Sequence, residues 1–202
     1  MKDKIMILDG SRRLHIDNTL EVLSNLRNIR QIQQRIWKSF DLPFIDSYVA
    51  QAYNSGRAQV DVEEFMARLS MNNHLQRENY DALKIVLIDK DMYSSREGTN
   101  FGFGVTFAYD NANKYVIVST ARLRDELHAR HVLAHELGHA FGAPSSERQD
   151  VYNSLGMHCE DRNCTMHQEL SGESSYQQAQ RIARQGRVYC PSCTEDIRGY
   201  MR

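Results

Sequence analysis

The chain has 202 residues, of which 41% are hydrophobic, so it can bury one good core and is too short for two comfortable domains. Its 25 basic residues nearly balance its 26 acidic residues, so net charge gives no electrostatic reason to expect binding to nucleic acid or to an anionic membrane. We therefore expect one globular domain over residues 1–202, with a function that must be inferred from a site.

The N-terminal segment MKDKIMILDGSRR contains only a short apolar stretch before polar residues return. We interpret Lys4–Leu8 as a buried strand and not as a signal peptide. No apolar run in the sequence approaches the roughly 18 residues that a membrane-spanning helix requires. These features predict a soluble cytoplasmic protein with no membrane partner.

Helical spacing follows this first strand. Apolar residues recur at three- and four-residue intervals between Leu20 and Phe40, which predicts a helix there. Two shorter helices are predicted over residues 60–69 and 75–83. None of these segments carries recognisable chemistry.

The middle of the chain predicts strands. Residues 83–88 (LKIVLI) are continuously apolar and rich in β-branched residues, as is typical of a strand covered on both faces. Residues 102–109 and 114–120 are two further extended runs, joined by Asp, Asn, Ala and Asn, so we predict a β-hairpin.

The last predicted elements surround a histidine motif. A helix is predicted from Arg124 to about Phe141, because Gly142 with a proline close behind is the usual stop signal. Residues 143–156 are polar and predict a loop, and residues 176–185 predict another helix. The order of elements predicts an α/β sheet layer followed by a small irregular C-terminal part.

Residues 135–139 read HELGH. Positions four apart lie one above the other on a helix, so His135 and His139 can bind one zinc ion at about 2.0 to 2.1 Å. Glu136, beside them, can take a proton from a water that attacks a carbonyl. HExxH arises by chance in on the order of one chain in a few hundred. Gly142 strengthens the signal, because it lets the helix stop sharply and the chain turn back toward the metal.

Two more histidines, His128 and His131, precede this motif on the same predicted helix. Although His131 shares the helical face of His135, three successive histidines on one straight helix span too far to surround one ion. We therefore expect both to be surface or core-edge residues.

All four cysteines fall within the last 44 residues, as Cys159, Cys164, Cys190 and Cys193. Such clustering favours a metal site, and four sulfurs at about 2.3 Å from zinc form a closed structural site with no room for substrate. Two disulfides remain an alternative, although the lack of an export signal disfavours them. A redox CPSC motif is another, and it would need a helix beginning directly after Cys190.

Together these motifs resemble the archaemetzincins, whose pattern is HExxHxxGxxHC, four residues, Cys, one residue, Met, and later CxxC. The matching segments are HELGHAFG (135–142), HCEDRNCTM (158–166) and CPSC (190–193), with a further likeness over residues 101–123. The likeness covers roughly the C-terminal half.

The resemblance implies a metzincin-like α/β fold. Its parts would be a twisted mixed sheet with an edge antiparallel strand, packed helices that include the active-site helix, and a small irregular zinc-bound part. Within one metalloprotease-like domain, residues 1–142 would supply the sheet and the active-site helix. Residues 143–202 would supply the third ligand, the methionine turn and the four-cysteine zinc site.

One departure from the pattern concerns the third histidine. Ser145 occupies its position, and His158 follows 13 residues later, directly before Cys159. We interpret residues 143–157 as containing a 13-residue insertion. Other side chains that could replace this ligand are Glu147, Asp150 and His167, or, in a different class of zinc site, Glu169 or Glu173.

The resemblance also implies the roles of individual residues. The catalytic zinc would be bound by His135, His139 and His158, with Glu136 as the general base, and Met166 would lie in a turn beneath the metal. The second, structural zinc would be bound by the four cysteines, so the protein would hold two zinc ions.

We therefore predict a zinc metallopeptidase, a metzincin-type hydrolase that cleaves peptide bonds in a peptide or protein substrate. An extended peptide could pair with the strand around residues 105–109. The oligomeric state is left open. The alternative function is a non-catalytic, zinc-stabilised module that binds a protein or peptide.

Overall fold

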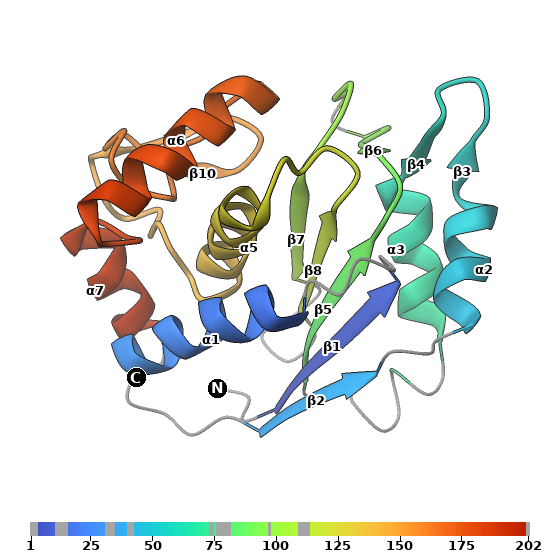
Figure 1. The fold of residues 1–202 in the computed structure, drawn as a ribbon, viewed down its shortest axis with the longest axis horizontal. Helices are drawn as coiled ribbons and strands as arrows, with labels where there is room; N and C mark the ends of the chain where they lie inside the picture. Colours follow the sequence, from blue (N-terminus) through green and yellow to red (C-terminus); the bar gives the residue numbers. More distant parts are fainter. Residues whose placement is uncertain are drawn as a thin grey trace. The chain divides into compact units, whose positions relative to one another are not determined.

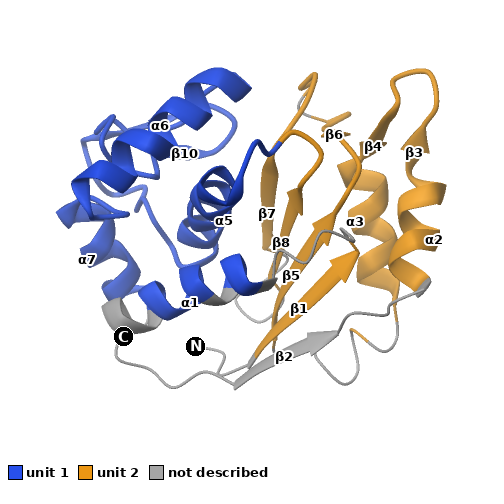
Figure 2. Cartoon of the chain, in the orientation of Figure 1, with its two compact units in different colours: residues 1, 17–33, 123–202 blue, residues 2–16, 34–122 orange. Residues whose placement is uncertain are grey.

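The computed structural model describes residues 4–10, 16–30, 35–39, 43–72, 75, 82–96, 98–108 and 114–200. Its contacts divide the chain into two compact units (Figure 2). The helical unit comprises residues 1, 17–33 and 123–202, and the sheet unit comprises residues 2–16 and 34–122. The organisation of residues 1–202 as one domain with two parts that meet at residue 142 stays a prediction.

A five-stranded sheet forms the framework of the sheet unit (Figure 1). Its strand order is β2 (Arg35–Ser39), β1 (Lys4–Gly10), β5 (Leu83–Ile88), β8 (Lys114–Ser119) and β7 (Gly104–Ala108). The pairs β1–β2, β1–β5 and β5–β8 are parallel, whereas β7 pairs with β8 in the antiparallel direction. The predicted α/β class, with a mixed sheet and an antiparallel edge strand, is confirmed.

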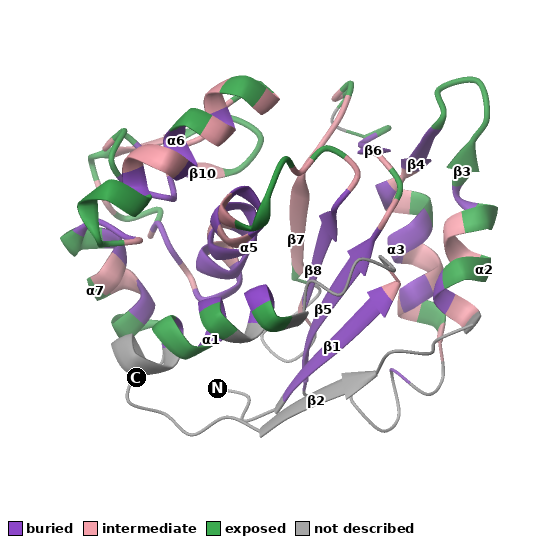
Figure 3. Ribbon diagram, in the orientation of Figure 1, coloured by how far each residue is buried: buried purple, intermediate pink, exposed green. Residues whose placement is uncertain are grey.

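Strand β5 lies at the centre of this sheet, and all six of its residues are buried (Figure 3). Its continuous apolar sequence is thus explained by a strand with paired neighbours on both edges and covered side chains on both faces. The predicted hairpin is confirmed by the register of β7 and β8, in which Thr106 lies opposite Val116. Its connection, residues 109–113, lies outside the described residues.

The helix predicted from Leu20 to Phe40 is wrong in its second half. Helix α1 (Ile16–Arg30) ends before residue 31, and residues 35–39 form strand β2, which pairs with β1. A short segment with isoleucine and tryptophan suits a strand as well as a helix, so periodicity alone could not decide between them. Tertiary pairing with β1 decided it.

A small second sheet and two helices complete the sheet unit. The sheet consists of β3 (Tyr53–Asn54), β4 (Gln59–Asp61) and β6 (Met92–Tyr93), and the helices are α2 (Pro43–Gln51) and α3 (Val62–Met71). The helix predicted over 60–69 is therefore confirmed as α3. It begins at Val62 because the preceding Asp61 is its N-cap, whose carboxylate accepts a hydrogen bond from the backbone N–H of Glu63. Most of the helix predicted over 75–83 lies outside the described residues.

The core of the sheet unit is a cluster of buried side chains from one face of the large sheet, from α2 and α3 and from the small sheet. Its members are Met6, Leu8, Ile45, Ala52, Val60, Val62, Phe65, Met66, Leu69, Leu75, Val86, Ile88, Met92, Tyr115 and Ile117. Burial of these apolar surfaces is the main favourable contribution to the stability of the unit.

The helical unit contains the C-terminal elements and most of α1. They are α5 (Glu126–Ala140), β9 (Val151–Asn153), β10 (Met157–Cys159), α6 (Gly172–Gln185) and α7 (Pro191–Gly199). The helices predicted around HELGH and over 176–185 are confirmed as α5 and α6. Among the described residues, no helix combines the length and the apolar character that a membrane crossing requires.

The loop predicted over residues 143–156 is wrong in part, because Val151–Asn153 is a strand. It pairs with β10 in a short antiparallel hairpin in which Tyr152 lies opposite His158. Leu155 and Gly156 in the turn have positive φ angles of 53° and 112°. A three-residue strand in a polar segment has too short a pattern for its sequence to reveal it.

Replacement of Leu69, which is fully buried in α3, tests the core of the sheet unit. We expect Leu69→Ala to lower the free energy of unfolding by about 2 to 5 kcal/mol, because it removes apolar contacts and leaves a cavity. Met71→Ala on the same helix is the control, since that side chain is 78% exposed. Urea unfolding followed by circular dichroism measures both, and an equal effect of the two substitutions would contradict the described core.

Candidate functional site

Helix α5 presents two of the histidines, and its ends are defined by local interactions. Asp125 is the N-cap, and its carboxylate accepts a hydrogen bond of 2.8 Å from the backbone N–H of His128. At the other end, the N–H groups of Gly142 and Ala143 bond to the carbonyls of His139 and Gly138, which is the pattern of a Schellman motif. Gly142 has a φ of 81°, so glycine suits this turn because it lacks a Cβ.

Three histidines converge in this unit. His135 and His139, one turn apart on α5, have their Nε2 atoms 3.2 Å from each other. His158, carried by β10, brings its ring centroid to 5.2 Å from each of the other two rings. One ring nitrogen of each of the three lies within 4.8 Å of those of the other two, so the group could hold a metal ion.

Backbone carbonyls orient two of these rings. Nδ1 of His135 donates to the carbonyl of Thr165 at 2.7 Å, and Nδ1 of His158 donates to the carbonyl of Gly156 at 3.0 Å. A ring whose Nδ1 carries the proton keeps the lone pair of Nε2 available for a metal. The carbonyls thus select the tautomer that a ligand needs.

The spacing of the donor atoms fits zinc. In a tetrahedral site with Zn–N bonds of 2.0 to 2.1 Å, two ligand nitrogens lie about 3.3 to 3.4 Å apart. The two Nε2 atoms of α5, at 3.2 Å, are close to that separation. Three neutral imidazoles with a fourth position left open are a donor set typical of catalytic zinc.

Burial keeps these imidazoles neutral. It lowers the pKa of His135 and of His158 to about 4, and that of His139 well below its ordinary value. Because metal ions bind the unprotonated ring, this environment favours ligation at neutral pH.

The other side chains considered as third ligands have different partners. Nδ1 of His167 donates to the carbonyl of Cys159 at 2.9 Å, and Asp150 forms an ion pair with Arg148 at 2.6 Å. Glu173 pairs with Arg124. Glu147 and Glu169, like these three, are not members of the histidine group.

Met166 packs against α5 at Gly138. Met166 is fully buried, and a Cβ built on Gly138 would lie only 2.2 Å from its sulfur. The hydroxyl of Tyr189 donates to the carbonyl of Ala134 at 2.6 Å and reinforces the same contact. A side chain at position 138 is therefore excluded by the close approach of Met166 to the helix.

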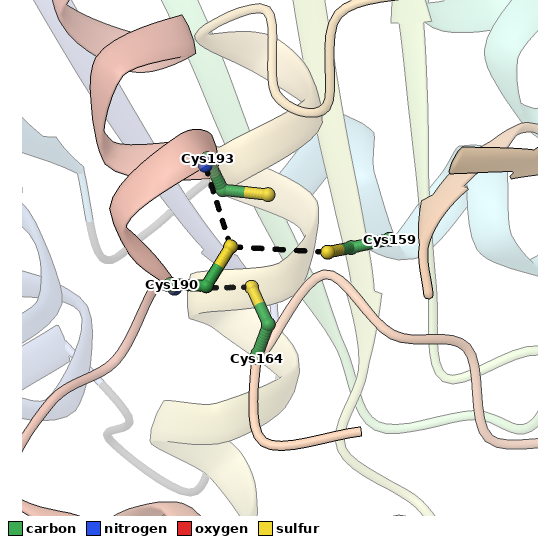
Figure 4. Close-up of side chains that lie close together, drawn as sticks. All are labelled: Cys159, Cys164, Cys190 and Cys193. Atoms are coloured by element: carbon green, nitrogen blue, oxygen red, sulfur yellow. Dashed lines mark hydrogen bonds between the residues drawn. The ribbon is translucent and has the colours of Figure 1, made fainter. Parts of the chain in front are cut away.

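The four cysteines form a second group, all buried, with every sulfur within 4.8 Å of the others (Figure 4). The sulfurs of Cys159 and Cys190 are 3.8 Å apart. This matches the edge of a zinc tetrahedron with Zn–S bonds of about 2.3 Å, which is about 3.8 Å, and it is far longer than a disulfide bond of about 2.05 Å. The donor set and its spacing fit a structural zinc ion.

Helix α7 begins at Pro191 with Cys190 as its N-cap. A redox CPSC motif requires a helix directly after its first cysteine, and α7 meets that requirement. What disfavours the alternative is the presence of Cys159 and Cys164 beside the pair. Hydrogen bonds among the four thiols lower the pKa of Cys159 to about 7 and raise the pKa of Cys164 and of Cys193.

The expectation that His128 and His131 are surface or core-edge residues is wrong for both. They are 0% and 7% exposed, and their Nε2 atoms lie 3.0 Å from Oγ of Ser175 and 2.9 Å from Oε1 of Gln178. Two polar residues of α6 thus give each ring one partner at Nε2, whereas Nδ1 of His131 is buried without a hydrogen-bond partner. Helical spacing cannot reveal such partners, because they come from a different helix.

Arg148 contacts the cysteine group, a contact that the sequence did not predict. Its guanidinium lies 3.2 Å from the sulfur of Cys193 and 3.7 Å from that of Cys159. A single arginine in a polar loop carries no sequence signal of such a contact.

Comparison with known proteins agrees with this geometry. The family described as metallo-peptidase family M12B, reprolysin-like, matches residues 29–144, more than half of the chain. The chain belongs to this family. The match contains the HELGH segment of the metallopeptidase and ends before His158 and the four cysteines.

A curated relative extends the likeness. The metallopeptidase is 34% identical over 105 residues to the archaemetzincin of Nanoarchaeum equitans (strain Kin4-M), a match that covers 52% of this chain and 51% of that protein. The chain thus spans about half the length of the relative that it matches. The resemblance to archaemetzincins predicted from the sequence is confirmed.

Two solved structures share the fold. A zinc-dependent peptidase from Methanocorpusculum labreanum (strain Z) has a TM-score of 0.55 and 18% identity, over 96% of this chain and 99% of that chain. Metalloproteinase-II from Bacteroides fragilis has a TM-score of 0.53 and 15% identity, over 98% of this chain and 52% of that chain. The predicted metzincin-like fold is confirmed by these similarities.

Gly138→Ala tests the contact beneath the histidines. The new methyl group would overlap the sulfur of Met166, so we expect a loss of about 1 to 3 kcal/mol in unfolding free energy. Gly199→Ala in α7 is the matched control, because a Cβ there has open space and should not destabilise the helix. Thermal and urea unfolding compare the variants, and an unchanged Gly138→Ala protein would rule out the described packing.

The lowered histidine pKa values predict a pH dependence of the metal-free protein. Five residues contribute: His128, His131, His135, His139 and His158. The unfolded chain takes up protons near pH 6.5 while the folded chain does not, so stability is complete above about pH 6.5 and falls as the pH drops toward 4.

Urea unfolding at pH 7 and pH 5 in the presence of a chelator measures this difference. His131→Gln removes a titrating group outside the metal-ligand candidates and should narrow the gap between the two values. Equal unfolding free energies at both pH values for the parent chain would refute the buried, neutral state of these rings.

Proposed function

We propose that this chain is a zinc-dependent metallopeptidase with a catalytic zinc on His135, His139 and His158 and a structural zinc on the four cysteines. The observation that carries the proposal is the convergence of the three imidazoles. Two of them come from one helix and the third comes from a separate hairpin, and two are held in the tautomer that frees Nε2.

Zinc in such a site supplies Lewis acidity, which activates water and polarises the carbonyl of a peptide bond. Glu136 would be the general base. It lies between the two histidines of α5 in sequence and is 7% exposed, so its carboxylate is largely shielded from bulk water. In this role Glu136 takes a proton from the attacking water and passes it to the leaving amine.

The surrounding residues would act through the ligands. The carbonyls of Thr165 and Gly156 hold the rings of His135 and His158, as partners of metal-bound histidines commonly do. Met166 has its sulfur packed against Gly138, so we assign it a structural role in the turn beneath the site and no bond to zinc.

The four-cysteine zinc would stabilise the segment that follows the catalytic helix. Cys159 is the chain neighbour of His158 and forms one corner of the group, while Cys190 and Cys193 come from the start of α7. A closed thiolate site contributes folding free energy directly. It would join two segments of the helical unit into one scaffold, within a single domain that includes the sheet unit, and its thiolates suit a cytoplasmic location.

A peptide or protein substrate follows from the family and from the peptidase to which the fold is similar. Strand β7 is an edge strand of the five-stranded sheet, and extended peptides commonly bind proteins by adding a strand at such an edge. The alternative function is a zinc-stabilised module that binds a protein or peptide without cleaving it, which the same buried ligand groups would also support.

Glu136→Gln separates these functions. In a peptidase, loss of the carboxylate removes proton transfer, so we expect turnover of a denatured protein substrate to fall by about 10²- to 10⁴-fold. Elemental analysis should still find both zinc ions, because Glu136 is not a member of either ligand group.

Two variants serve as controls for the metal count. His158→Ala should retain only the cysteine-bound zinc, and Cys190→Ser should lose the structural zinc together with folding stability. Wild-type protein that holds both metals but cleaves no peptide or protein substrate under any condition would favour the binding module. A wild-type protein with a single zinc would contradict the proposed histidine site.

A further inference from the structure

We infer that Arg148 is a positioning residue that couples the two metal sites. Its side chain ties the hairpin that carries His158 to the sulfurs of the four-cysteine group. The inference rests on the proposed function, because it takes the histidine group and the cysteine group as metal sites.

Arg148 makes part-buried contacts with Asp196, Cys193 and Cys159 and an exposed ion pair with Asp150, whose side chain is 53% exposed. The side chain of Arg148 is 14% exposed, and Nη1 donates to Oδ2 of Asp196 at 2.7 Å and to the sulfur of Cys193 at 3.2 Å. Its other two nitrogens, Nε and Nη2, donate to the two carboxylate oxygens of Asp150 at 2.7 and 2.6 Å. Nη2 also lies 3.7 Å from the sulfur of Cys159. A planar fork with this many acceptors is held in one orientation.

The hydrogen bonds to the four sulfurs come from backbone N–H groups and from the guanidinium of Arg148. The backbone N–H of Cys190 donates to Cys164 at 3.3 Å, and the N–H of Cys193 donates to Cys190 at 3.4 Å. Cys193 accepts from the guanidinium of Arg148, and Cys159 accepts from the same guanidinium and from the backbone N–H of Asp161. Arg148 is therefore a side chain from outside the cysteine motifs that contacts two of the four sulfurs.

Charge favours this placement. Four thiolates carry more negative charge than one zinc ion neutralises, and the guanidinium is positive at every relevant pH. Asp196, which is 12% exposed, also accepts a hydrogen bond of 3.0 Å from the N–H of Ser145. Asp196 thus fixes both the arginine and the start of the 143–157 segment to α7.

The connection to His158 runs through the hairpin. Arg148 is bonded to Asp150, which directly precedes β9, and the carbonyl of Asp150 accepts from the N–H of Glu160 at 3.1 Å beyond the end of β10. In the same hairpin, Val151 is paired with Cys159 and Tyr152 with His158. Arg148 therefore links the open end of the β9–β10 hairpin to the cysteine group. His158, on the same hairpin, lies beside the other two histidines.

The physical consequence is preorganisation. None of residues 145–157 is buried, and apart from Arg148 the hairpin is held mainly by Tyr152, so loss of the Arg148 bonds should let the segment sample more conformations. His158 then spends less time beside His135 and His139, and the affinity of the histidine group for metal falls. Partners of this kind are typically worth about 10- to 100-fold in metal affinity.

Cobalt titration of the metal-free full chain tests the coupling without reference to activity. Thiolate-bound cobalt has a charge-transfer absorption that histidine-bound cobalt lacks, so the two sites can be followed separately. We expect Arg148→Gln to weaken cobalt binding at the histidine group by about 10- to 100-fold. Arg148→Lys keeps the charge without the fork and should recover part of this affinity.

Arg130→Gln is the matched control. Arg130 lies in the same unit and forms ion pairs with Glu21 and Glu126, but it is not bonded to any cysteine sulfur. Its replacement should leave both cobalt affinities unchanged. Should Arg148→Gln fail to fold, Asp150→Asn decides the question, because it removes the charge and one of the two acceptors that hold Arg148 to the hairpin and leaves the arginine on the sulfurs. That variant should weaken the histidine group and preserve the thiolate absorption.

The outcomes are distinct. Histidine-group affinities within twofold of wild type in Arg148→Gln, or in Asp150→Asn if the first variant does not fold, would overturn the coupling. A wild-type chain that binds cobalt through thiolates alone would instead contradict the proposed function.

Discussion

The arrangement of the helical unit depends on bringing three imidazoles together, with His158 buried and His135 and His139 half-buried. Two of them are placed by helix geometry alone, since His135 and His139 are one turn apart on α5. The third must be delivered by a separate segment. An imidazole that stands away from the others would leave the metal with two protein ligands, fewer than the three that catalytic zinc sites ordinarily use. The neighbouring elements therefore have to hold His158 beside the other two histidines.

Close packing against α5 helps to hold the histidines in place. Gly138 lets Met166 approach the helix, and the carbonyl of the preceding residue, Thr165, then accepts the hydrogen bond of His135. Gly142 lets the chain leave the helix and turn. The two glycines thus act at different levels, one by allowing a side chain to approach and the other by allowing a backbone conformation.

The cysteine group also helps to hold His158 in place. It gathers Cys159 and Cys164 from one segment and Cys190 and Cys193 from another, and strand β10 carries both His158 and the sulfur of Cys159. The family match ends at residue 144, and the segment that follows differs from the archaemetzincin pattern in length. The β9–β10 hairpin accommodates the additional residues and still presents His158 beside the other two rings. Extra length in a surface connection costs little conformational entropy when its base is held.

The sequence by itself determined those features that local chemistry encodes. The HELGH helix with its glycine stop, the central strand LKIVLI and the clustering of cysteines all depend on short-range patterns, and each was predicted from the residues involved. Tertiary structure alone decided the rest. Residues 35–39 became a strand by pairing with β1, His128 and His131 became buried because α6 supplies their partners, and Arg148 reached the sulfurs because two separate segments meet there. Such contacts join residues that are distant in the chain, so no periodicity or spacing within a single segment could reveal them.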